Sequence, residues 1–345
     1  MTDSAALLDW YAANARTLPW RAPSGAPVPG DPDWPYRVWL SEIMLQQTTV
    51  AAVIPYFSAF TARWPSVVAL AAADDADVMK AWAGLGYYAR ARNLLACART
   101  VVADHGGRFP DDEAGLRALS GVGAYTAAAI AAFGFGRFAV IVDGNIERVV
   151  TRLFAIATPL PAARAQIRAQ MAEITPERAG DFAQAMMDLA RRICTPRAPA
   201  CGACPLRAGC RAAAGDPQAF PVKAPKRPRS TRHGTAWWLE TDGSVLTVVR
   251  PAKGLLGGMR ALPSCDWRGG DGVPPIGGDW RDLGVVTHGF THFELVLTVR
   301  SLVLPTPAVA GDWWPIAAIG SAGLPTVFEK ATILALATRG EGPDD

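Results

Sequence analysis

The sequence lacks an uninterrupted apolar run long enough to span a membrane. The longest candidate, Tyr125–Val142, is broken by Gly134, Gly136 and Arg137, whereas a spanning helix needs about 20 consecutive apolar residues. Met1–Trp20 contains acidic residues and lacks the basic and then apolar segments of a secretory signal peptide. We therefore expect a cytoplasmic protein that does not associate with membranes.

Neither sign of charge dominates the sequence. Its 345 residues include 34 Lys and Arg against 31 Asp and Glu, which gives a net charge of +3. A protein that binds nucleic acid mainly through charge is usually more basic, so the composition permits DNA binding without arguing for it. Half of the residues are hydrophobic, which excludes a disordered chain, and the length suffices for two or three domains.

The pattern of apolar residues divides the chain into two domains joined by a linker, without internal repeats. Residues 1–220 are predicted to be helical, because apolar residues recur at helical spacing over Ala5–Ala15, Val38–Phe60, Ala114–Phe133, Asn145–Phe154 and Asp181–Ile193. Residues 221–234, rich in Pro, Lys and Arg, predict a linker. Its charge could lie along phosphates or simply face solvent.

Residues 235–345 predict a smaller α+β domain. Val, Leu, Thr and Trp are concentrated in four short segments bounded by Gly, Pro and Asp, namely Ala236–Glu240, Val245–Arg250, Leu283–Thr287 and Phe293–Leu304. A helix is expected to begin at Thr326, where Glu329 would complete a capping box.

Cysteine is scarce, with six residues, but four of them lie close together. They follow the spacing C-x6-C-x2-C-x5-C at Cys194, Cys201, Cys204 and Cys210. Clustered cysteines in a reducing compartment indicate a metal site, and four thiolates can hold zinc or a [4Fe–4S] cluster. The asymmetric spacing favours iron–sulfur and leaves zinc open. Cys97 and Cys265 are expected to be ordinary core residues.

Two carboxylates lie in apolar surroundings. Glu42 is the only charged residue between Arg37 and Arg63, and desolvation should raise its pKa, which suits a general acid. The alternative is a Glu at the solvent edge of an amphipathic helix. Asp143 follows an apolar run and could stabilise a cationic sugar, as paired carboxylates do in glycosidic chemistry. Its alternative is a helix N-cap, which Asn145 could also supply.

A glycine pair lies between two helical stretches. Gly121 and Gly123 allow a tight turn whose free N–H groups, at a helix N-terminus, could bind a phosphate. By itself this spacing usually marks only a turn. In combination with Asp143 and the four cysteines it becomes informative.

Together these motifs resemble the helix-hairpin-helix DNA glycosylase superfamily and, within it, the MutY-type adenine DNA glycosylases. The resemblance covers nearly the whole chain. It is carried by 18–21 (LPWR), 38–48 (VWLSEIMLQQT), 84–88 (GLGYY), 121–123 (GVG), 142–145 (VDGN), 183–189 (AQAMMDL) and the cysteine quartet. It implies a mainly α helix-hairpin-helix domain with a [4Fe–4S] cluster, followed by a Nudix-like α+β domain.

The resemblance also implies a role for individual residues. Glu42 would protonate adenine at N7 and then assist the attacking water, and Asp143 would stabilise the oxocarbenium ion, supported by Tyr125 and Asn145. The residues that contact the substrate or DNA would be Arg21 and Gln184 in the adenine pocket, Gln47 and Tyr88 inserted into the base stack, Gly121 and Gly123 on phosphate, and Arg197 in the cluster loop. For Tyr88 an ordinary core position is the alternative.

The implied partner is double-stranded DNA with adenine opposite 8-oxoguanine or G. A nucleoid-associated monomer is expected, and a sliding clamp is a candidate partner.

Tyr125 distinguishes between related activities. Endonuclease III-like enzymes resemble this chain but carry Lys at this position, which forms a Schiff base and allows strand cleavage. Tyr cannot form one, so we predict a monofunctional glycosylase. The two alternatives are a bifunctional endonuclease III-like enzyme and a non-enzymatic DNA-binding iron–sulfur protein.

The C-terminal segments 253–263 and 287–293 carry the Nudix-like resemblance. Phe290, Thr291 and His292 would contact 8-oxoguanine, and Thr291 stands where the family usually has Ser. Arg260 stands where an aromatic residue is common. The glutamate run that binds Mg²⁺ in active Nudix hydrolases is missing from 236–345, so nucleotide hydrolysis is not expected.

Overall fold

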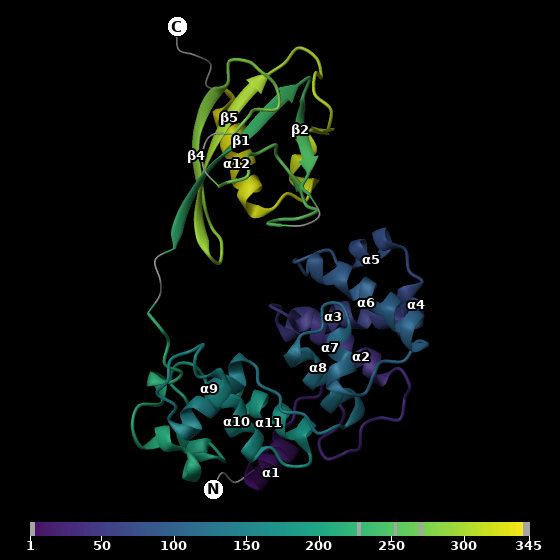
Figure 1. The fold of residues 1–345 in the computed structure, drawn as a ribbon, viewed down its shortest axis with the longest axis vertical. Coiled ribbons are helices and arrows are strands. Elements are labelled where there is room, and N and C mark those ends of the chain that lie inside the picture. The colour runs from purple at the N-terminus through teal and green to yellow at the C-terminus, as the bar shows by residue number, and fades with distance from the viewer. Residues whose placement is uncertain (1–3, 226–228, 252–253, 269–271, 341–345) are drawn as a thin grey trace. The chain divides into compact units, whose positions relative to one another are not determined.

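The computed structural model describes residues 4–225, 229–251, 254–268 and 272–340, which form two compact units, Met1–Pro225 and Lys226–Asp345 (Figure 1). The division falls inside the segment 221–234 that composition predicts to be a linker, and the first strand begins within it, at Ser230.

The first unit is helical. Its α-helices are α1 (Ser4–Asn14), α2 (Trp34–Leu45), α3 (Val50–Arg63), α4 (Val67–Ala71), α5 (Asp75–Ala81), α6 (Ala89–His105), α7 (Glu113–Ala118), α8 (Ala124–Ala129), α9 (Gly144–Phe154), α10 (Arg164–Ile174) and α11 (Ala179–Arg192). Side chains cap several N-termini as the sequence favours; Asp74 accepts from two backbone N–H groups ahead of α5, for example. None of the helices in the described residues has the length and apolar character that a membrane span requires.

The helical stretch predicted over Val38–Phe60 consists of two helices. α2 ends at Leu45 and α3 begins at Val50, with Gln47 between them at a φ of 59°. Thr49 is the N-cap of α3, so the Thr48–Thr49 pair was the available signal for a helix start. The break presents Gln47 on a turn at the surface.

α2 is the central helix of the first unit. Nine of its twelve residues are buried, including Trp39, Leu40 and Met44, so it is apolar nearly all round, as an interior helix must be. The single carboxylate of this helix therefore lies in the core and not at a solvent edge.

The second unit is a mixed sheet with one α-helix. Its strands are β1 (Ser230–Thr241), β2 (Ser244–Val249), β3 (Arg260–Ala261), β4 (Arg281–Gly289), β5 (Phe293–Val303) and β6 (Asp312–Pro315), and the helix is α12 (Thr326–Ala337). The order is β3-β2-β1-β5-β4 with β6 on β2. Among the strand pairs of the described residues only β1–β5 is parallel, with Ser230 opposite Phe293. Trp238, Leu295 and Phe328 lie in its core.

The capping box expected at Thr326 and Glu329 is wrong. The helix begins at Thr326 as predicted, but its N-cap is Pro325, which makes no side-chain capping bond. Thr326 is thus inside the helix, one position too far along the chain to cap it.

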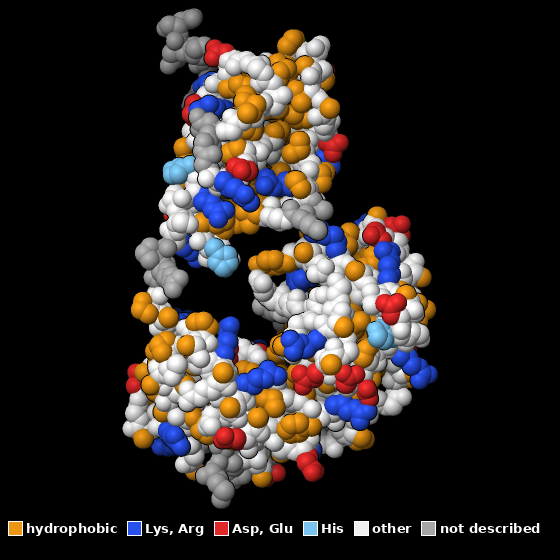
Figure 2. Space-filling view, viewed as in Figure 1, with side chains coloured by type: hydrophobic (Ala, Val, Ile, Leu, Met, Phe, Trp, Pro, Cys, Tyr) orange, Lys and Arg blue, Asp and Glu red, His pale blue; other side chains and the backbone are white. Residues whose placement is uncertain are grey.

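The surface carries both signs of charge. Figure 2 shows Lys and Arg side chains interspersed with Asp and Glu over the visible face of the helical unit, in keeping with the small net charge of the sequence. The face of the helical unit that Figure 2 shows therefore carries mixed charge and not a broad basic field.

Candidate active site

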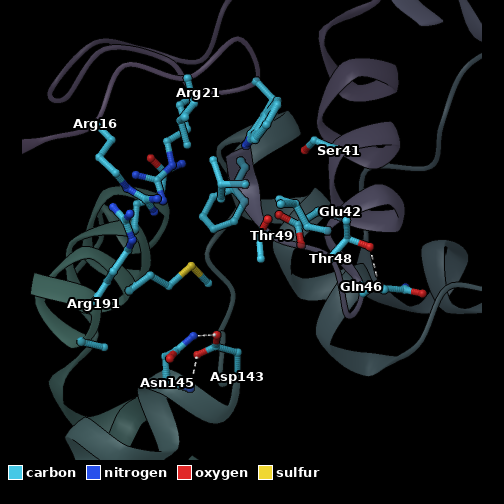
Figure 3. Close-up of a pocket in the computed structure, with 18 of the residues that line it drawn as sticks. Arg16, Arg21, Ser41, Glu42, Gln46, Thr48, Thr49, Asp143, Asn145 and Arg191 are labelled. Atoms are coloured by element: carbon cyan, nitrogen blue, oxygen red, sulfur yellow. Dashed lines mark hydrogen bonds between the residues drawn. The ribbon is translucent and has the colours of Figure 1, made fainter. Parts of the chain in front are cut away.

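A pocket of about 960 Å³ opens in the helical unit (Figure 3). Its wall combines the segment before α2, the end of α2, the turn that follows, α8, the start of α9 and α11. Residues predicted for catalysis or binding that line it are Arg21, Glu42, Gln47, Tyr125, Asp143, Asn145 and Gln184. Side chains from distant parts of the sequence thus converge on one cavity of ligand size.

Glu42 enters the pocket from the buried helix α2. Only 8% of it is exposed, and burial raises its pKa from 4.5 to about 7, partly opposed by a hydrogen bond from Tyr125 and the charge of Arg21. Burial and the neighbouring charge of Glu42 raise the pKa of Tyr125 well above its ordinary value, so its hydroxyl stays protonated and can donate. At neutral pH Glu42 is therefore poised between its acid and base forms.

Asp143 is the N-cap of α9. Its Oδ1 accepts hydrogen bonds from the backbone N–H groups of Asn145 (3.0 Å) and Ile146 (2.7 Å), and its Oδ2 accepts one from Nδ2 of Asn145 (2.9 Å). These three donors and the helix N-terminus stabilise a negative charge at the edge of the pocket. The observed capping is compatible with the predicted catalytic role, because capping fixes where the carboxylate lies.

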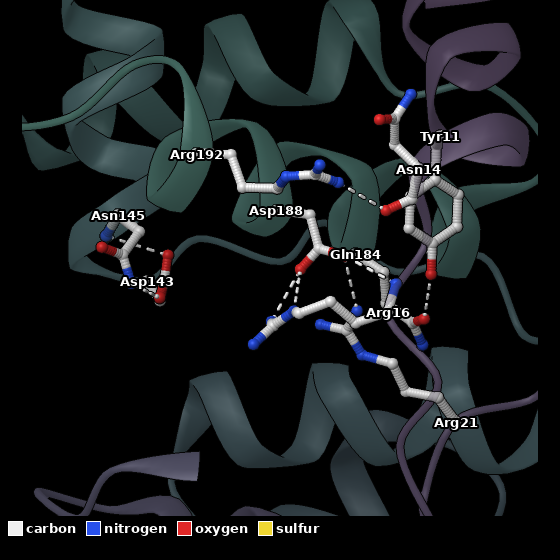
Figure 4. A network of polar contacts seen from close by, with 9 residues as sticks. All are labelled: Tyr11, Asn14, Arg16, Arg21, Asp143, Asn145, Gln184, Asp188 and Arg192. Carbon is white, nitrogen blue, oxygen red and sulfur yellow. Dashed lines mark hydrogen bonds and ion pairs between the residues drawn. The ribbon is translucent and has the colours of Figure 1, made fainter. Parts of the chain in front are cut away.

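Gln184 and Arg21 belong to a buried polar network (Figure 4). Tyr11 donates to Oε1 of Gln184 (2.7 Å), and Asp188, fully buried, accepts from Arg21 (2.9 Å) and from Nε of Arg16 (2.7 Å). Tyr11, Arg16 and Asp188 were missed as site residues. The available signal was that Asp188 is the only acidic residue in 182–215, the same isolation that singled out Glu42.

The turn after α2 is held by an arginine that sequence reasoning also missed. Arg90 donates to the carbonyl oxygens of Met44 (2.9 Å) and Leu85 (2.8 Å) and to the Thr48 hydroxyl (3.2 Å). It therefore joins the turn that carries Gln47 to the turn ahead of α6.

The two tyrosines ahead of α6 differ in exposure. Tyr88, predicted to insert into DNA, is half-buried and packs against the core. Tyr87 is 62% exposed at a φ of 48°, with the Arg90 guanidinium 5.6 Å from its ring centroid. The alternative reading of Tyr88 as a core aromatic thus fits its position, and Tyr87 is the accessible ring.

The glycine pair forms the turn between α7 and α8. Gly121 has a φ of 76°, and a Cβ there would lie 3.0 Å from Cβ of Asn93, so the position favours glycine twice over. Gly123 is the N-cap of α8, without a side-chain cap, and nothing lies within 4 Å of a Cβ built there. Its open N-terminus suits a phosphate contact.

The four clustered cysteines are all half-buried in one loop region after α11. Their thiols interact electrostatically with one another, and backbone N–H groups of Leu206, Ala212 and Ala213 face the sulfurs of Cys204 and Cys210. In the described residues, however, no three His, Cys, Asp or Glu side chains come together as they would around one metal ion. Four neighbouring thiols, two of which receive backbone N–H donors, suit a multi-iron cluster better than a single zinc ion.

Two arginines of α9 hold the cysteine loop. Arg152, buried, donates to Sγ of Cys194 (3.3 Å) and to the carbonyl oxygen of Thr195 (2.7 Å), and Arg148 donates to the carbonyl oxygen of Cys194 (2.9 Å). Arg197 is exposed in the same loop, and its carbonyl oxygen accepts from Thr195. The loop that carries Arg197 is therefore fixed to the helix that carries Asp143.

Phe290, Thr291 and His292 lie in the second unit, between β4 and β5. Phe290 stacks on Phe293 with ring centroids 4.8 Å apart, while Thr291 and His292 are exposed. Arg260, where an aromatic residue was expected, bonds Asp312 and Thr247 (2.8 Å each) and lies over Trp314. The substitution is thus accommodated by an ion pair and a stacked ring.

Comparison with known proteins identifies the family. Residues 40–177 match the HhH-GPD superfamily of base excision DNA repair proteins, and residues 235–333 match the NUDIX domain. The chain is 38% identical to the adenine DNA glycosylase of Mycobacterium tuberculosis (strain H37Rv) over 72% of this chain and 78% of that one. The chain belongs to the adenine DNA glycosylase family. This confirms the predicted fold class and the prediction of a DNA N-glycosylase that excises adenine in base excision repair.

Two further matches extend the comparison. The human adenine DNA glycosylase is 35% identical over 86% of this chain, which spans 66% of the human protein's length. Among solved structures, a thermostable thymine-DNA glycosylase matches 61% of this chain and 94% of its own with a TM-score of 0.55 and 28% identity. That match concerns the helical part of the fold, which adenine DNA glycosylases share with relatives of other specificity.

Proposed function

We propose that this chain is a monofunctional glycosylase that extrudes adenine paired with 8-oxoguanine, or with G, and hydrolyses its glycosidic bond. The observation that carries the proposal concerns Glu42. Its side chain is buried, has a pKa of about 7, and lines the same pocket as Asp143. Glu42 can donate a proton at neutral pH, and the Asp143 carboxylate is held in place to stabilise positive charge. Cleavage of a glycosidic bond needs one group in each of these two roles.

In the proposed reaction Glu42 gives its proton to N7 of adenine as the bond between C1′ and N9 breaks. Adenine leaves with the bonding electron pair, and the sugar becomes an oxocarbenium ion that the Asp143 carboxylate stabilises. The Glu42 carboxylate then takes a proton from the water that attacks C1′, which restores the acid. Tyr125 holds Glu42 in place by a hydrogen bond, the charge of Arg21 favours the Glu42 carboxylate, and Gln184 orients the base.

The cysteine quartet is proposed to hold a [4Fe–4S] cluster, which the facing thiols and the N–H donors support. Bound there, it would serve as a structural clamp that fixes the loop carrying Arg197. Analysis of iron and acid-labile sulfide in the purified protein tests this, and stoichiometric zinc in place of iron would contradict it. A monomeric state, a sliding-clamp partner and nucleoid association stay predictions.

The assay that tests the function uses duplexes with adenine opposite 8-oxoguanine, G and T. We expect the fastest adenine release opposite 8-oxoguanine, with strand breaks appearing mainly after alkali, because Tyr125 cannot form a Schiff base. Borohydride should trap no covalent adduct. Strand breaks without alkali at oxidised pyrimidines, together with a trapped adduct, would indicate an endonuclease III-like enzyme. Binding without base release would indicate a non-enzymatic protein.

We propose that Tyr87, and not its neighbour Tyr88, inserts into the base stack beside Gln47. Its ring is exposed and Tyr88 packs on the core. Tyr87→Ala should weaken binding to the mispair duplex about 10-fold to 100-fold, because stacking of a base on an aromatic ring is worth about 1–3 kcal/mol, without lowering the melting temperature. Tyr88→Ala should lower the melting temperature instead. Fluorescence anisotropy and thermal unfolding of both variants check this, and the reverse assignment of the two effects would refute it.

A further inference from the structure

One face of α11 lines the pocket from its interior to its edge. Gln184, Met187 and Arg191 recur at helical spacing, and all three belong to the pocket wall. Gln184 is buried and Arg191 is exposed. The two residues are seven positions apart in the helix, so Arg191 lies about 10 Å farther along the helix axis, where the pocket meets solvent.

The arginines of the pocket wall differ in what they bind. Arg16 and Arg21 are paired with Asp188, and Arg148 donates to two carbonyl oxygens and to Asn145. Among the residues that the structure describes, the side chain of Arg191 makes no hydrogen bond or ion pair. Its five N–H donors are therefore available to a ligand.

The neighbourhood of Arg191 has a surplus of positive charge. In Figure 3 its side chain extends toward those of Arg16 and Arg21. Both of these arginines are already paired with one carboxylate, that of Asp188. Like charges that line one cavity repel one another unless an anion lies between them. The arrangement is that of an anion site.

We propose that Arg191 binds a backbone phosphate of the DNA strand that carries the extruded adenine. The proposal rests on the proposed function, which places the base near Gln184 and the sugar near Asp143. The phosphate attached to that sugar must then lie toward solvent along the same wall, where Arg191 is. A guanidinium suits this ligand, because its planar fork can bind two phosphate oxygens at once.

The chain offers a matched control in the adjacent residue. Arg192 carries the same charge on the same turn, but it donates to the carbonyl oxygen of Asn14 (2.9 Å) and lies over Trp10, outside the pocket wall. Figure 4 shows it directed toward Asn14. Arg191→Gln and Arg192→Gln therefore remove equal charge from different surroundings.

The test measures the salt dependence of binding to a duplex with 2′-fluoro-2′-deoxyadenosine opposite 8-oxoguanine, in which fluorine prevents cleavage by destabilising the cationic sugar. We expect Arg191→Gln to reduce the slope of log K against log [KCl] by about 0.9, the value for one lost phosphate contact, and to weaken binding about 10-fold at a fixed salt concentration. Arg192→Gln should leave the slope unchanged, and Arg191→Lys should largely preserve it, because the charge is retained.

Two outcomes would overturn the proposal separately from the function. Equal slopes for the unsubstituted protein and Arg191→Gln, or equal losses in the two glutamine variants, would remove Arg191 from the binding site while adenine release from the cleavable duplex continues. If the unsubstituted protein releases no adenine from that duplex, the proposed function fails and the Arg191 assignment fails with it.

Discussion

Replacing Glu42 by glutamine should lower the single-turnover rate of adenine release by at least about 10²-fold, and by up to about 10⁴-fold, the range that general acid–base catalysis supplies. Glutamine has nearly the same shape as protonated glutamic acid but has no proton to give to N7 and cannot accept one from water. Binding of the mispair duplex should change little. Loss of binding together with catalysis would instead indicate a folding defect.

The same residue predicts how the rate depends on pH. Because the protonated form is the donor, adenine release by the unsubstituted protein should fall as the pH rises through about 7, the raised pKa of Glu42. The midpoint should be visible in single-turnover rates that isolate the chemical step. A profile that is flat from pH 6 to pH 8 would contradict Glu42 as the acid.

The raised pKa also has a consequence for stability. Between pH 4.5 and about 7 the folded protein holds a proton that the unfolded chain has lost, so stability falls as the pH rises through this window. The rise in the pKa of Glu42 corresponds to about 3 kcal/mol of the free energy of unfolding. This contribution is present at low pH and is fully lost above about pH 7. Glu42→Gln should lack this pH dependence and be at least as stable as the unsubstituted protein at neutral pH. Denaturant unfolding at several pH values measures both, and separates a catalytic loss from a structural one.

Replacing Asp143 by asparagine should lower the rate of adenine release by about 10²–10³-fold, the usual loss when one electrostatic partner of the transition state is removed. Asparagine caps a helix about as well as aspartate, so the start of α9 should stay intact and only the negative charge is lost. The measurement is again single-turnover adenine release, with thermal unfolding alongside it.

Asp143→Ala is the matched control for that experiment. It removes the charge and also the hydrogen bonds to Asn145 and Ile146, which should cost about 1 kcal/mol of stability in addition. If asparagine restored the activity that alanine loses, the role of Asp143 would be capping alone and the electrostatic assignment would be wrong.

The sequence singles out the two carboxylates proposed for catalysis because each lies beside an apolar segment, which can be seen from the sequence alone. Glu42 and Asp143 stand out in this way, and so does Asp188 in retrospect. The sequence does not show their partners, however, because a buried charge needs partners that only the fold supplies. The partners of Asp188, Arg16 and Arg21, lie more than 160 residues away, and no local pattern predicts such a pairing.

The choice between Tyr87 and Tyr88 could not be made from the sequence. Two adjacent tyrosines have the same propensities, and their exposure depends on the left-handed backbone at Tyr87. The break at Gln47 also depends on a left-handed residue. In the sequence it is indicated only by the polar run 46–49, in which the Thr48–Thr49 pair suits a new helix start. Local periodicity predicts elements well and the breaks between them poorly.

Arg90 gives these two irregular turns a shared physical basis. One guanidinium binds the carbonyl oxygens of Met44 and Leu85, so the loops that present Gln47 and Tyr87 are ordered together when the protein folds. Fixing the backbone of one residue costs about 1–2 kcal/mol in conformational entropy. In these turns that entropy is lost when the protein folds and not when it binds DNA. In the proposed insertion, both side chains would enter the base stack from turns that are already ordered, so that less of the free energy of binding would be spent on ordering them.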